Sequence, residues 1–144
     1  KRKEITTEGG LNLNYKTKFL MTIISKLKKN KSRVSLFIEP NLSDIKKAKL
    51  LNVDCIEIHT GKICNQINKN LNYKKEFKKI IKAVNFANKI GLEVHAGHGL
   101  TYKSAKILSK TRGIKEFNIG HFLIGESIYE GLPAVIKRFM KIIV

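Results

Sequence analysis

The four histidines of this chain all follow short apolar segments, at the points where we expect strands to end. They are His59, His95, His98 and His121, and three of them lie in the glycine-containing turns His59-Thr60-Gly61, Gly97-His98-Gly99 and Gly120-His121. Glycine lets backbone N–H groups approach a ligand closely, and such a turn leading into a helix N-terminus forms an anion site. In parallel α/β folds, ligands bind at the carboxyl edge of the sheet. The last two turns therefore predict a phosphate site.

Glu57 lies in the middle of an apolar segment, where a carboxylate is costly unless it is paired or functional. It has three interpretations: a structural ion pair with a Lys or Arg, acid–base work together with a histidine, or a metal site. In the metal site, His95 and His98 would be ligands, completed by Glu57 or His59. The loose spacing of the two histidines, with no accompanying Cys or Asp pair, argues against zinc.

Strands that alternate with helices must position these residues. We expect strands at 34–38, 54–58, 92–95 and 117–119, and helices at 16–29, 43–51, 73–90, 101–110 and 132–143. Ser43 is the expected N-cap of the second helix, and Gly91 the residue that ends the third. We expect a polar loop over 61–72, a short helical turn before the last helix, and no histidine within a helix.

Each predicted strand has one apolar face and one partly polar face, because side chains alternate across a strand. Ile56 and Ile58 share a face, whereas Cys55, Glu57 and His59 share the other. A doubly wound open sheet is covered by helices on both faces and should be apolar on both. A barrel can turn a polar face into its interior, so we favour half of a (β/α)8 barrel, because a whole one needs about 250 residues. Residues 1–144 then form a single, partial barrel domain.

The composition is strongly basic, with 29 Lys and Arg against 11 Asp and Glu and a net charge of +18. Such an excess can bind nucleic acid. All but four of the basic residues are lysine, however, and they are spread over every predicted helix without interleaved aromatics, so a solvated surface is the favoured interpretation. No segment is apolar and long enough to span a membrane, and two cysteines build no disulfide framework. We expect a cytoplasmic protein that binds neither nucleic acid nor membrane.

Five segments occur in an order that resembles the second half of the pyridoxine 5′-phosphate synthase family: EITTEGGL (4–11), VSLFI (34–38), IEIHTG (56–61), AGHGLTY (96–102) and NIGH (118–121). The resemblance extends over nearly the whole chain. It implies the C-terminal half of a (β/α)8 TIM barrel. The implied reaction condenses 3-amino-2-oxopropyl phosphate with 1-deoxy-D-xylulose 5-phosphate to give pyridoxine 5′-phosphate, inorganic phosphate and water, with no metal or organic cofactor.

The resemblance also implies residue roles. His98 is the expected proton donor, and Glu57 the residue that stabilises or orients a transition state. The aminoketone phosphate would be held by Gly99, Gly120 and His121, and the deoxyxylulose phosphate contacted by Thr6. The full-length enzyme is expected to be a homo-oligomer.

The chain departs from the family pattern at two positions. His95 stands where an Asn is expected, and Glu39 where a shorter Asp is expected. Catalytic and phosphate-binding residues of the family's first half have no counterpart here, so residues 1–144 alone are expected to be inactive. Two other hypotheses stay open: another phosphate-binding barrel lyase or isomerase, and a basic nucleic-acid-binding α/β module.

Overall fold

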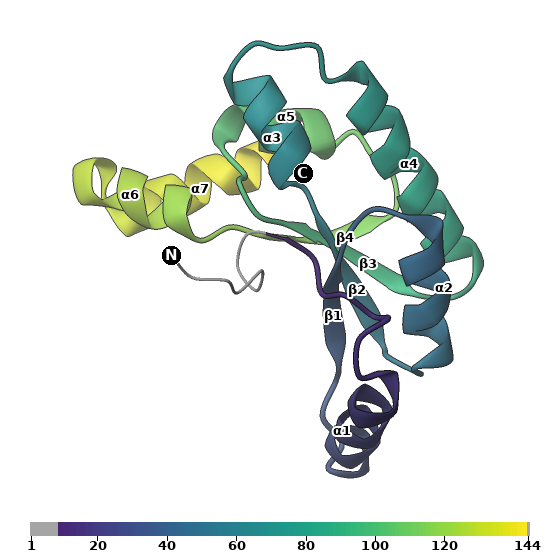
Figure 1. Ribbon diagram of the computed structural model, residues 1–144. Coiled ribbons are helices and arrows are strands. Elements are labelled where there is room, and N and C mark those ends of the chain that lie inside the picture. Colours follow the sequence, from purple (N-terminus) through teal and green to yellow (C-terminus); the bar gives the residue numbers. More distant parts are fainter. Residues whose placement is uncertain (1–8, 144) are drawn as a thin grey trace, which may run out of the picture.

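Parallel strands alternate with helices through the computed structural model, which describes residues 9–143 (Figure 1). The elements are α1 (Thr17–Lys29), β1 (Ser35–Ile38), α2 (Leu42–Leu50), β2 (Cys55–His59), α3 (Gly61–Asn68), α4 (Lys74–Lys89), β3 (Glu93–Gly97), α5 (Tyr102–Leu108), β4 (Ile114–Asn118), α6 (His121–Glu130) and α7 (Leu132–Ile143). The α/β fold class is confirmed.

The four strands are parallel and neighbour one another in chain order, β1-β2-β3-β4. A doubly wound sheet reverses its strand order at a switch point, and no reversal occurs among these strands. Strands that follow one another in this way are those of half a (β/α)8 barrel, as expected.

The two faces of the sheet differ as the strand pattern predicted. One face consists of buried aliphatic side chains, among them Ile56, Ile58 and Val94, each fully buried. Helix α4 packs on this side with apolar residues spaced by three or four positions, namely Ile80, Ala83, Val84 and Ala87. Each buried isoleucine stabilises the fold by about 1.5–3 kcal/mol, so this face anchors the sheet.

The opposite face is polar, and its side chains lie in rows across the strands. The register places Phe37 beside Glu57, Glu57 beside His95, and His95 beside Glu116. An irregularity between Val94 and His95 shifts β4 by one residue relative to β3. This shift keeps Glu116 and Asn118 on the polar face, because side chains alternate along the strand.

The remaining helices lie at the ends and edges of the sheet. Figure 1 shows α6 and α7 together beyond β4, and α1 near the start of β1. Residues before α1 run beside β1, where the Leu11 N–H donates to the Phe37 carbonyl at 2.8 Å. A Cβ at Gly10 would lie 2.3 Å from the Glu39 nitrogen, so only glycine allows this approach. Within residues 9–143, no helix combines the length and apolar character needed to cross a membrane.

Four local expectations were wrong. The expected polar loop over 61–72 contains α3, which buries Ile63, Cys64 and Ile67. The N-cap of α2 is Asn41 instead of Ser43, because the Asn41 side chain accepts the Asp44 N–H. The expected short helical turn is the ten-residue helix α6. His121 is its first residue, so one histidine does lie in a helix. Gly91 ends α4 as expected, with φ +73°.

Candidate active site

The carboxyl ends of the strands and the turns that follow them surround one cavity. It has a volume of about 400 Å³ and is lined by Phe37, Glu57, His98, Gly99, Leu100, Thr101, Asn118, Gly120, His121 and Phe122. Five of the six expected site residues, all except Thr6, therefore lie at the same cavity. Thr6 is outside the described residues. A carboxylate, an imidazole and two glycine turns share this space, which is the set of groups that proton transfer on a phosphorylated substrate requires.

Glu57 is half-buried on the polar face of β2, and its partner is an amide. Asn118 Nδ2 donates to Glu57 Oε2 at 2.7 Å. Among the described residues no Lys or Arg forms an ion pair with Glu57, so the structural ion-pair interpretation is wrong there. A Cβ at Gly97 would lie only 1.8 Å from Glu57 Oε1. Glycine at position 97 thus leaves the space that the carboxylate occupies.

His98 lies in a turn whose backbone is unusual for a residue with a side chain. Its φ is +77°, and Gly99 follows with φ +76°. Left-handed backbone at a non-glycine residue is uncommon and persists where neighbouring groups stabilise it. The buried Thr60 provides this: its N–H donates to the Gly97 carbonyl at 2.9 Å. Thr60 Oγ1 also lies 2.7 Å from the Gly97 oxygen and 2.9 Å from the His98 oxygen.

A pair formed by Glu39 and His59 lies beside His98. His59 Nδ1 is 2.6 Å from Glu39 Oε1, and the Gly10 N–H donates to the same oxygen at 3.0 Å. Partial burial would by itself raise the pKa of the Glu39 carboxyl, but the hydrogen bonds from Gly10 and His59 outweigh it and lower that pKa. Glu39 is therefore an ionised acceptor for the His59 N–H at neutral pH. The departure from a shorter Asp places a carboxylate within reach of His59.

The N-terminus of α6 opens into the cavity. Its N-cap residue is Gly120, and no side chain caps its first backbone N–H groups. The N-terminus of α5, in contrast, is closed by a capping box in which Thr101 and Ser104 bond each other's backbone N–H groups. Uncapped N–H groups and the helix dipole favour an anion. Of the two helix starts at this cavity, α6 is the one available to a phosphate.

His95 has a different environment from the other candidates. It is 5% exposed, its Nε2 lies 2.8 Å from Glu93 Oε1, and its Nδ1 lies 3.7 Å from Glu116 Oε1. It does not line the cavity with His98. In the part of the chain that the structure describes, no three His, Cys, Asp or Glu side chains are arranged to hold a metal ion. The zinc alternative has no support in this geometry.

The residues missed by sequence reasoning are Phe37, Thr60 and Asn118. Thr60 stands between His59 and Gly61 at a strand end. Its hydrogen-bond partners are carbonyls far away along the chain, so neither its residue type nor its location indicated its role. Side chains alternate along β4, and the register that pairs Asn118 with Gly97 puts Asn118 on the same face of the sheet as Glu57. Side-chain parity on neighbouring strands is thus the one signal that could have identified it.

Comparisons with known proteins indicate the family of the chain. The family model described as pyridoxal phosphate biosynthesis protein PdxJ matches residues 1–144. Proteins named pyridoxine 5′-phosphate synthase match from Pelagibacter ubique (57% identical over 142 residues, 99% of this chain and 59% of the relative), Zymomonas mobilis (48% over 138 residues, 96% and 53%) and Ehrlichia chaffeensis (41% over 143 residues, 99% and 58%). The chain therefore spans a little over half the length of these relatives. With a family model that covers it entirely and half of a TIM barrel as its fold, the chain belongs to the PdxJ family of pyridoxal phosphate biosynthesis proteins.

Proposed function

We propose that this chain forms the part of a pyridoxine 5′-phosphate synthase that holds one phosphate and carries out proton transfer. The reaction is the condensation of 3-amino-2-oxopropyl phosphate with 1-deoxy-D-xylulose 5-phosphate to give pyridoxine 5′-phosphate, inorganic phosphate and water. The observation that supports it best is the single cavity shared by Glu57, His98 and the Gly120-His121 helix start.

Each of the described residues has a role that its position supports, and the role of Thr6, which lies outside them, depends on the family resemblance alone. His98 donates the proton in the dehydration and ring-closing steps. Glu57 stabilises or orients the transition state, with its carboxylate held by Asn118. The phosphate of the aminoketone is bound by the backbone at Gly99, Gly120 and His121. Thr6 contacts the deoxyxylulose phosphate.

The open edges of the sheet lead to a proposal about assembly. β1 and β4 are the edge strands of the described sheet. A closed barrel has no edges, and exposed edges promote aggregation. We infer that both edges pair with strands from the rest of a full-length synthase. A homo-oligomer in the cytoplasm remains our proposal for that protein.

The test is a chimera in which residues 1–144 replace the matched segment of the Pelagibacter ubique relative. We expect this chimera to form pyridoxine 5′-phosphate from the two phosphorylated substrates, and His98→Gln or Glu57→Gln to lower kcat at least about a hundredfold. Residues 1–144 alone should give no turnover. An inactive but folded chimera contradicts the proposed function, and turnover by residues 1–144 alone contradicts the expected dependence on the other half.

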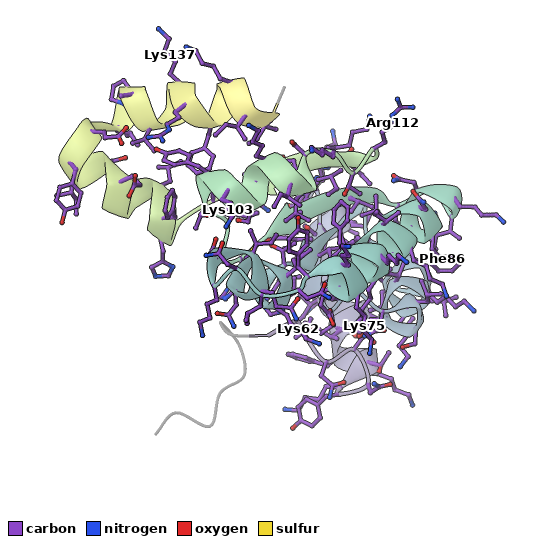
Figure 2. All side chains as sticks on the ribbon, turned by 90° about the horizontal axis from the view of Figure 1, so that it is seen from above. Lys62, Lys75, Phe86, Lys103, Arg112 and Lys137 are labelled. Carbon is purple, nitrogen blue, oxygen red and sulfur yellow. The ribbon has the colours of Figure 1, made fainter. Side chains whose placement is uncertain are left out.

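The nucleic-acid hypothesis predicts a different result. Figure 2 shows the labelled side chains Lys103, Arg112 and Lys137 on separate parts of the molecule, whereas Lys62 and Lys75 lie near each other at one hollow. A phosphate backbone is bound best by charges gathered in one stripe. We therefore expect only weak, sequence-independent binding to DNA or RNA. Tight binding that falls steeply with added salt would favour the nucleic-acid module instead.

A further inference from the structure

We propose that His59 is a positioning residue for His98, and that Glu39 fixes the orientation of His59. The inference deepens the proposed function, because it concerns the residue that donates the proton there. His59 and Glu39 do not line the cavity that contains Glu57, whereas His59 lines the neighbouring cavity together with His98, and we place its action through His98.

The rings beside His98 limit where its imidazole can lie. The ring centroids of His59 and His98 are 4.8 Å apart, with the planes at 68°. Phe37 lies against both, with its centroid 5.2 Å from that of His59 and 6.4 Å from that of His98. Edge-to-face packing of this kind favours one relative orientation of the rings. A displaced His59 ring would therefore release the His98 ring.

Gly61 shows how closely the two imidazoles converge. A Cβ built at this position would lie 2.6 Å from Nε2 of His59 and 2.7 Å from Cδ2 of His98. Both rings thus border the same point in front of the first residue of α3. A side chain larger than hydrogen at position 61 would separate them, so glycine is required here by the approach of two side chains.

The contact with Glu39 determines which nitrogen of His59 carries its proton. Glu39 is an ionised acceptor, so Nδ1 of His59 is the donor at 2.6 Å. When the ring carries a single proton, Nε2 then has the lone pair. This atom is buried and has no hydrogen-bond partner within the described residues, and the side chain as a whole is 10% exposed. Nε2 of His59 and Cδ2 of His98 border the same point beside Gly61, so a lone pair on this nitrogen would stabilise the imidazolium form of His98, which is the form that a proton donor needs.

Other charged groups also act on this pair, and the test must allow for them. Lys79 lies near enough to Glu39 to affect its ionisation. The titratable groups that border His98 within the two neighbouring cavities are Glu57, His59, Lys62 and His121. The variants at positions 59 and 39 change the proposed support while they leave Glu57, Lys62 and His121 in place.

The experiment uses the full-length chimera with His59→Phe and Glu39→Gln. His59→Phe keeps a ring against Phe37 and His98 but has no nitrogen. Glu39→Gln keeps a hydrogen-bonding group without the charge. Glu130→Gln is the matched control. It removes the same charge from Glu130 at the end of α6, which forms an exposed ion pair with Arg138 of α7. Folding is checked by circular dichroism and thermal unfolding.

For both variants we expect kcat to fall about tenfold, while KM for each substrate changes less than about twofold. For His59→Phe, the basic limb of the kcat–pH profile should move to lower pH by about half a unit or more, because the His98 imidazolium loses its neighbouring lone pair. Glu39→Gln should move it in the same direction by less, because the amide oxygen of the introduced Gln can still accept the His59 N–H. The 15N signals of His98 should show the same shift in titration. The Glu130→Gln control should keep the native profile.

The outcomes separate this inference from the proposed function. If the unsubstituted chimera folds but makes no pyridoxine 5′-phosphate, the proposed function fails, and the His98 titration still decides the role of His59. If the chimera is active and both variants keep the native kcat and titration, His59 is only a packing residue and the inference is overturned. If one variant does not fold, the kcat and the His98 titration of the other variant decide whether His59 positions His98.

Discussion

A methyl group at position 97 should damage the site while the fold stays intact. The Cβ of a Gly97→Ala variant would lie 1.8 Å from Glu57 Oε1 and 2.8 Å from Glu57 Cδ. The carboxylate must retreat by more than about 1 Å before this becomes an ordinary contact. Its hydrogen bond from Asn118 is then lost or lengthened. The backbone can accept alanine, because Gly97 is not among the glycines with positive φ.

The expected effect on catalysis is much larger than the effect on stability. Misplacement of a catalytic group by about 1 Å can lower a rate about a hundredfold, so kcat of the chimera should fall by about that factor. The free energy of unfolding should fall by only about 1–2 kcal/mol, because the clash is with the end of a flexible, half-exposed side chain. KM should change little, since the closest clash is with the Glu57 carboxylate and not with the backbone that we assign to the phosphate.

The assay is synthase turnover together with chemical unfolding, and Gly125→Ala serves as the control. Among the described residues nothing lies within 4 Å of a Cβ at Gly125, which is inside α6. This control should keep the native kcat and gain about 0.5–1 kcal/mol of stability. A folded Gly97→Ala chimera with native kcat would refute the role of Glu57 at this location. If Gly97→Ala does not fold, Asn118→Ala removes the donor without adding atoms and decides the same question.

Three further predictions follow from the contacts around the site and from α1. Thr60→Val should lower the free energy of unfolding by about 1–3 kcal/mol and also lower kcat, whereas Thr60→Ser, which keeps the hydroxyl, should be close to native by both measurements. The Lys28 ammonium lowers the pKa of Asp54, so that carboxylate stabilises the fold above its ordinary pKa of about 3.9 and loses this effect as pH falls. Asp54→Asn should therefore be less stable than the native chain at pH 7, with a difference that shrinks toward pH 2 in unfolding titrations; a constant difference would contradict the pairing. In a double-mutant cycle, Gly97→Ala and His59→Phe should have additive effects on kcat within about 0.5 kcal/mol, because they disturb separate contacts. Strong coupling between the two substitutions would show that the supports of Glu57 and His98 are not independent.

Much of this fold could be predicted from local patterns. The alternation of short apolar segments with helical stripes gave the four strands and the parallel arrangement. Strand parity also placed Glu57 away from Ile56 and Ile58, as the structure confirms. These features depend on residues close together in the chain, where a period of two or of 3.6 is visible.

The errors came from weak or non-local signals. Helix α3 has only three buried apolar residues among Lys, Asn and Gln, so its pattern is too short to distinguish from a polar loop. Asn and Ser are both common N-cap residues, so residue type alone did not distinguish Asn41 from Ser43. The N-cap of α2 is Asn41, because its side chain accepts the Asp44 N–H. The left-handed backbone at His98 could not be predicted, since it depends on Thr60, which is 38 residues away along the chain.

The supports of Glu57 and His98 come from different strands, and small residues in the turns leave room for both. Glu57 is held from the β3–β4 side, by the space at Gly97 and the amide of Asn118. His98 is held from the β1–β2 side, by Thr60 and the ring of His59. Rigid strands place each support, and glycine at positions 97 and 61 leaves room for the supported side chains. A site of this kind tolerates a drift toward lysine on its outer surface, because none of these contacts involves an exposed helix face.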